Sequence, residues 1–161
     1  MKKIVRSLVV IAMACLAGVM AGCGSGGSTA AVDTSAGSES KLTLSVETAP
    51  AGSLIGGIQG AITLPEGSSV RTEGTGEAVL SEVFSASGNA ASSLAAAKFT
   101  KATRVVKYAV VNASGFSGGD FATLVVQVPA GVSVNTADVT LSENQVVDIS
   151  GNTMNLAITK K

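Results

Sequence analysis

The thiol of Cys23 is the side chain whose surroundings most clearly indicate chemistry. The small residues Ala21 and Gly22 stand directly before it, as at the cleavage site of a secretory signal, and an apolar run begins at Leu8. Basic residues precede that run: Lys2, Lys3 and Arg6. We therefore predict that residues 1–22 are a signal peptide that is removed, which leaves Cys23 at the start of the mature chain.

The segment Met20–Cys23 resembles the lipobox of bacterial lipoproteins, with Met where Leu is usual. The resemblance implies that Cys23 carries a diacylglycerol group and that this group anchors the protein to a membrane of the cell envelope. An Asp after the cysteine would favour the inner membrane in that family, whereas Gly24 implies the outer membrane or the cell surface. The alternative is an uncleaved transmembrane helix, but the run from Leu8 to Ala21 is shorter than the roughly 20 apolar residues that span a bilayer.

The residue types exclude several kinds of catalytic and metal site. The chain has no histidine, which excludes a Ser-His or Cys-His nucleophile and most zinc sites. Four acidic residues could in principle surround calcium, which binds carboxylate and carbonyl oxygens: Asp120, Asp138, Glu143 and Asp148. Their spacing lacks the Asp-x-Asp pattern of a calcium loop and favours turn formers and solvated charges. We therefore predict a protein that is not an enzyme and holds no metal and no cofactor.

The charge of the mature chain argues against nucleic acid as a partner. Removal of the signal peptide leaves eight basic and eleven acidic side chains, a formal net charge of −3. The chain has no cluster of Lys and Arg that could follow a phosphate backbone. An internal disulfide is excluded as well, because Cys15 leaves with the signal peptide and Cys23 is acylated.

Composition divides the mature chain into a tether and one domain. Residues 24–40 consist almost wholly of Gly, Ser, Ala and Thr, which bury too little apolar surface to fold. We therefore predict that residues 23–40 are the acylated cysteine and a flexible linker. Residues 41–161 then form one domain of ordinary size.

Alternation of apolar and polar residues begins at Lys41 and is typical of β-strands. Two runs show it clearly, Leu42–Val46 and Ile58–Leu64. Further strand candidates are 69–72, 78–84, 96–100, 104–112, 121–128, 137–141, 146–149 and 154–159. Turn residues separate them, so the sequence predicts an all-β fold, an antiparallel β-sandwich of about nine strands. The aromatic side chains are expected in its core: Phe84, Phe99, Tyr108, Phe116 and Phe121.

The order of these segments resembles that of cohesin domains and their carbohydrate-binding-module relatives. Ile55–Leu64 resembles the cohesin segment in which a Gly-hydrophobic-Gln run opens a strand, and Arg104–Val111 is similar to the strand before a Gly-rich loop. Gly118–Val128 resembles the family's passage of Gly followed by an apolar-Ala-Thr-apolar strand, and Val139–Ile158 continues in the same order. The resemblance spans most of residues 41–161 and implies a jelly-roll-type β-sandwich.

The function that this resemblance implies is binding without catalysis. A lipid-anchored cohesin-like domain would attach a protein partner, such as a dockerin-like module, or act as a scaffold at the cell surface. The alternative is a carbohydrate-binding module with a role in polysaccharide binding or degradation. Sugar sites usually present exposed aromatic rings, and this chain has no Trp and a single Tyr, Tyr108.

The strand candidate 104–112 is the predicted docking surface, together with strands near 69–72 and 96–100. Four of its residues are expected to contact the partner beside the ring of Tyr108: Arg104, Lys107, Ala109 and Asn112. Alternation separates two sets of side chains along this strand, Val106, Tyr108 and Val110 on one face and Val105, Lys107, Ala109 and Val111 on the other. The competing interpretation is a central strand that is buried on both faces.

Overall fold

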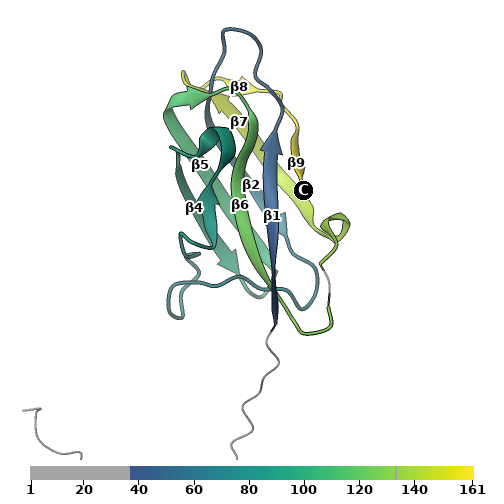
Figure 1. Cartoon of the computed structure of the whole chain (residues 1–161). Helices are drawn as coiled ribbons and strands as arrows, with labels where there is room; N and C mark the ends of the chain where they lie inside the picture. The colour runs from purple at the N-terminus through teal and green to yellow at the C-terminus, as the bar shows by residue number, and fades with distance from the viewer. Residues whose placement is uncertain (1–36, 133) are drawn as a thin grey trace, which may run out of the picture. The chain divides into compact units, whose positions relative to one another are not determined.

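The computed structural model describes residues 37–132 and 134–161. The predicted signal peptide, Cys23 and most of the predicted linker lie outside these residues. Among the described residues, no helix has the length and apolar character that a membrane crossing requires. The described chain forms two antiparallel sheets that pack against each other (Figure 1). This arrangement confirms the predicted all-β sandwich of about nine strands.

The four-stranded sheet has the order β3-β6-β1-β9. Its strands are β1 (Ser38–Val46), β3 (Phe84–Ala86), β6 (Gly119–Val128) and β9 (Ile158–Lys160). The five-stranded sheet has the order β4-β5-β2-β7-β8. Its strands are β2 (Ile55–Thr63), β4 (Leu94–Thr100), β5 (Val105–Phe116), β7 (Thr140–Asp148) and β8 (Thr153–Met154). Two short 3-10 turns, η1 (Gly88–Ala90) and η2 (Thr136–Asp138), connect strands.

The core lies between the two sheets and is built from the apolar side of each alternating strand. Leu44 of β1 and Ile62 of β2 are fully buried, as the alternation predicts. All five aromatic side chains are buried, which confirms the prediction that they fill the core. The ring of Tyr108 lies between those of Phe84 and Phe121, at centroid distances of 5.7 and 6.2 Å. Such tilted aromatic contacts add to the stabilisation from burial.

Strand β1 begins three residues before the predicted domain start at Lys41. Ser38 pairs with Val128, and the pairing continues in register as far as Leu44. Residues 38–40 therefore belong to the sheet and not to a flexible linker. Their backbone hydrogen bonds to β6 hold them there, although their side chains bury little surface.

Three predicted strands are wrong as continuous strands: 69–72, 78–84 and 154–159. The last of them is divided between β8 and β9, which lie in different sheets. Ser69 forms a single bridge to Gln127 of the four-stranded sheet, so residues 69–72 do not extend the sheet that contains β4 and β5. Ala78 forms a single bridge to Lys98, and a turn follows before β3. The chain turns between the first two segments at Gly74 and Gly76. Neither of these two segments therefore runs beside a partner strand for more than a short distance.

Strand β7 is one strand where the sequence predicts two, 137–141 and 146–149. Glu143 adopts a φ of +53°, and the pairing of β7 with β2 shifts between Gln59 and Ala61. A β-bulge of this kind lets a strand pass through a polar stretch without ending. Ala137 lies in η2 instead, where Asn135 caps its backbone N–H.

Candidate partner-binding face

The outer face of the five-stranded sheet is formed by rows of side chains that run across β4, β5, β2 and β7. The strand register aligns these rows. The first row is Leu94, Val111, Gly57 and Val147. The second is Ala96, Ala109, Gln59 and Gln145. The third is Lys98, Lys107, Ala61 and Ser142, and the fourth is Thr100, Val105, Thr63 and Thr140. We call these sixteen residues the outer face.

The first row makes one end of the outer face apolar. The side chain of Leu94 is 81% exposed and that of Val111 is 53% exposed, although both are large and hydrophobic. Gly57 stands beside Val111 and leaves a shallow depression of about 170 Å³, which Ala109 and Val147 also line. Adjacent exposed apolar side chains on an otherwise flat surface are typical of an interaction site.

The third row makes the middle of the outer face charged. The ammonium group of Lys107 lies 3.0 Å from the Glu143 carboxylate, and that of Lys98 lies 2.7 Å from Glu77. The hydrogen bond from Lys98 lowers the pKa of Glu77. Both ion pairs are exposed, and such pairs contribute little to stability.

Lys107 and Ala109, two of the four predicted contact residues, both lie on this outer face. The predicted alternation along β5 holds: Val106, Tyr108 and Val110 are buried, whereas Lys107 and Val111 are exposed. Strand β5 is therefore covered on its inner side only, and the competing interpretation of a strand buried on both faces is wrong.

Asn112 lies on the opposite side of β5 and does not face outward. Its side chain is only 8% exposed; the amide group donates to the Ser93 hydroxyl at 3.0 Å, and its oxygen accepts from the Ser114 N–H at 3.0 Å. The hydrogen bond to Ser93 links the segment before β4 to β5. The predicted contact at Asn112 is therefore wrong for this face.

Arg104 ends a turn before β5 and lies outside the four rows. Its φ of +55° belongs to the left-handed region, and its N–H donates to the Lys101 carbonyl at 3.4 Å. Its own carbonyl accepts from the Leu64 N–H at 3.0 Å, and its Nε atom is buried. Arg104 thus shapes the connection between β4 and β5, and the structure does not bring it together with Lys107 and Ala109.

Tyr108 belongs to the core and not to the docking surface. Its hydroxyl donates to the Asn144 side-chain oxygen at 3.3 Å. Gly60 lies opposite on β2, and a Cβ there would stand 2.7 Å from the Tyr108 hydroxyl oxygen, so the ring occupies the space that a side chain would need. Burial raises the pKa of Tyr108 to about 12.

We expect this raised pKa to be measurable directly, because Tyr108 is the only tyrosine in the chain. The unfolded chain loses the phenol proton near the ordinary pKa of 10.0, whereas the folded chain keeps it to about 12. The stabilisation that comes from the protonated phenol is therefore complete below pH 10 and is lost as the pH rises through 12. The slope in this window is on the order of 1.4 kcal/mol per pH unit.

Absorbance titration of the phenol tests this prediction, with denaturant unfolding at each pH. A Tyr108→Phe variant should lack this part of the pH dependence. A phenol that ionises near pH 10 in the folded protein would show that the ring is solvated.

The acidic residues that could surround calcium do not gather in one place, and Asp120 and Asp148 each have hydrogen-bond partners of their own. The carboxylate of Asp120 accepts hydrogen bonds from Lys161, at 2.6 Å, and from the Ser45 hydroxyl; these bonds lower its pKa. Asp148 accepts from Asn152, whose side chain and backbone lower the Asp148 pKa. Among residues 37–132 and 134–161, no three acidic, His or Cys side chains gather as a metal site would need.

Sequence reasoning missed several residues of the outer face: Leu94, Gln59, Gln145 and Val147. The side-chain amide of Gln59 donates to that of Gln145 at 2.7 Å, which joins β2 and β7 across the second row. Alternation within each strand carries the signal for which side these residues occupy. Their alignment in rows depends on register between strands distant in sequence, which no local pattern specifies.

Two cohesin domains of known structure are similar to this chain. The non-cellulosomal cohesin from the hyperthermophilic archaeon Archaeoglobus fulgidus has a TM-score of 0.50 and 18% sequence identity, over 74% of this chain and 74% of that chain. The type II cohesin A11 from Bacteroides cellulosolvens has a TM-score of 0.48 and 13% identity, over 74% of this chain and 84% of that chain. No protein-family model and no curated protein matches the sequence. The described part of this chain has a cohesin-like β-sandwich fold.

Proposed function

We propose that this chain is a non-catalytic, lipid-anchored envelope protein that binds a protein partner through the outer face of its five-stranded sheet. The observation that carries this proposal is the exposure of Leu94 and Val111 on the same face of the sheet as the charged pair of Lys107 and Glu143. Partner binding would remove the two apolar side chains from water, and the charges would set the orientation. A dockerin-like module is the class of partner that the resemblance to cohesins implies.

The proposed anchor is Cys23, and the proposed location is the outer membrane or the cell surface. Support comes from the sequence: a basic start, an apolar run too short for a comfortable membrane span, and small residues before the cysteine. The domain would then act as an attachment or scaffold module at the end of a tether. Such a role requires a binding face but no reaction.

The lack of catalysis is supported by the residue types and by their placement. The chain contains no histidine, and the four acidic residues considered above lie apart in the fold. Carbohydrate binding, the alternative function, has less support. All five aromatic side chains of the described residues are buried, so none offers a flat ring to a sugar.

Reversal of charge and bulk in the middle of the outer face tests the proposed function. The double variant Lys107→Glu, Ala109→Arg should lower partner capture by at least about thirtyfold, because it places a repelling charge and a large side chain at the centre of the face. Both residues are on the outer side of β5, so the melting temperature should change by no more than about 3 °C.

Pulldown from envelope extracts, binding to purified dockerin modules and a glycan array provide the measurements. Thr159→Arg is the matched control, since Thr159 is exposed on a strand of the other sheet. Normal protein capture by the folded double variant would place the interface elsewhere. If the wild-type protein binds a glycan and the double variant does not, the ligand of the outer face is a polysaccharide and not a protein.

A further inference from the structure

One edge of β1 is paired along only half of its length. On one side, β6 pairs with β1 from Ser38 to Val46. On the other side, β9 pairs with Leu44–Val46, and Thr43 exchanges both backbone hydrogen bonds with Lys161, at 3.0 and 2.9 Å. Among the described residues, no strand pairs with residues 38–42 on this side. Figure 1 shows β1 continuing well beyond the C-terminus of β9.

The backbone groups at this open edge belong to Glu39 and Lys41. Thr43 and Glu47 direct their N–H groups toward β9, where they donate to Lys161 and Ala157. Peptide groups alternate sides along an antiparallel strand, so those of Lys41 and Glu39 point to the same side as those of Thr43. The two residues thus present two N–H and two C=O groups to the open edge. An edge of this kind is a template for pairing with another strand.

The length of the open edge and the position of its midpoint allow it to pair with the same edge of a second copy of this chain. It begins with Ser38 at the start of β1 and ends with Leu42, because Lys161 occupies the position opposite Thr43. These five residues have Ser40 as their midpoint. Antiparallel pairing with the same edge of a second copy, about a two-fold axis at Ser40, places Ser38 opposite Leu42 of that copy. A longer pairing would collide with Lys161, so the edge defines this register by itself.

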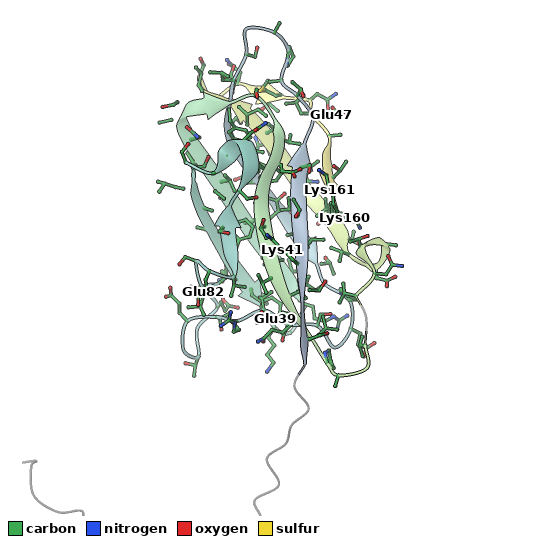
Figure 2. The ribbon with its side chains drawn as sticks, viewed as in Figure 1. Glu39, Lys41, Glu47, Glu82, Lys160 and Lys161 are labelled. Atoms are coloured by element: carbon green, nitrogen blue, oxygen red, sulfur yellow. The ribbon has the colours of Figure 1, made fainter. Side chains whose placement is uncertain are left out.

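The same register places opposite charges together. Glu39 comes to lie opposite Lys41 of the second copy, and Lys41 opposite its Glu39, as hydrogen-bonded pairs whose side chains share one face of the sheet. Figure 2 shows Glu39 and Lys41 on the part of β1 beyond Lys161. Lys41 has no ion pair within the described residues, and the Glu39 carboxylate is 3.8 Å from Arg71 in an exposed contact that constrains it little.

We propose that two copies of this chain associate through the open edge of β1 and form one continuous sheet across a two-fold axis. Four backbone hydrogen bonds, between Glu39 and Lys41 in both directions, and two ion pairs hold the two copies together. The contact involves five residues on each side, which makes it small and the dimer weak and reversible. Pairing also covers the exposed edge of β1, so each copy protects the other from less specific strand addition.

Charge reversal with rescue tests this proposal on the full chain. Glu39→Lys and Lys41→Glu should each raise the dimer dissociation constant at least about tenfold, because each sets like charges opposite one another twice. The double variant Glu39→Lys, Lys41→Glu restores both ion pairs and should return to the wild-type value. An equal mixture of the two single variants should form heterodimers, since every facing pair is then Lys with Glu. Lys101→Glu, an exposed change in a turn, is the control.

Sedimentation velocity over a range of protein concentrations gives the dissociation constants, with the same detergent for every protein. The N-terminal residues are identical in all variants, so association through a lipid anchor or a shared micelle cannot produce the expected pattern. A wild-type chain that stays monomeric up to millimolar concentration would overturn the proposal. So would single variants that dimerise like the wild type, or a double variant that fails to recover.

Discussion

An Ile62→Asp variant is expected to lose most or all of its folded population. Ile62 is fully buried near the end of β2, where it pairs with Val106 of β5 on one side and Leu141 of β7 on the other. The change removes apolar burial and places a carboxylate in the core without a partner, which costs several kcal/mol. Domains of this size have only about 5–15 kcal/mol of stability, so we expect the melting temperature to fall by at least about 15 °C.

Thermal unfolding followed by circular dichroism measures this effect, and Thr63→Asp is the matched control. Thr63 is the next residue on the same strand, but its side chain lies on the outer face and is half-buried. The same new carboxylate should there cost no more than about 1 kcal/mol. Equal melting temperatures for the two variants would mean that the faces of β2 are assigned the wrong way round.

The two faces of the main strands could be predicted from the sequence because burial imposes a period of two. Leu42 and Leu44 in β1 and Val106 and Val110 in β5 all lie in the core as the alternation indicates. The aromatic core was predictable for a related reason. A sandwich of this size needs large side chains, and the sequence supplies few others.

The region between β2 and β4 could not be predicted, because its strands depend on distant partners. Residues 69–72 show an acceptable strand composition, yet Ser69 finds only one pairing position, at Gln127. A strand continues only while a neighbouring edge accepts its hydrogen bonds, and local sequence does not reveal how long that edge is. The bulge at Glu143 could not be predicted either, because it depends on the pairing of β7 with β2, which continues on both sides of the bulge.

The candidate site was predicted in part, and its two errors have different origins. The alternation that places Lys107 and Ala109 outside also places Asn112 with Val110 on the inner side, so the sequence already carried the correct signal. The prediction of a partner contact at Asn112 relies on its polar side chain instead of on this alternation. The position of Arg104 was beyond local reasoning, because a positive φ in a residue other than Gly reflects the turn that joins β4 to β5.

A Cys23→Ser variant is expected to leave the membrane fraction almost completely. Under the proposed anchoring, the thiol of Cys23 is the attachment point for the acyl chains, and the mature chain has little else that binds lipid. One acyl chain gives only a reversible association, on the order of 10⁴ M⁻¹, whereas several chains on one residue hold a protein firmly. Replacement of the thiol by a hydroxyl removes the whole effect at once. Fractionation of cells and labelling with radioactive palmitate measure it.

Cys15→Ser provides the matched control, because it changes the other cysteine within the predicted signal peptide. That variant should be cleaved, labelled and retained like the wild type, since Cys15 leaves with the signal peptide. The Cys23→Ser variant should take up no label, and the chain that lacks its signal peptide should leave the membrane fraction. Equal labelling and retention of the two variants would show that another segment holds the protein at the membrane. An uncleaved N-terminal helix would then explain the apolar run from Leu8 better than a lipid anchor.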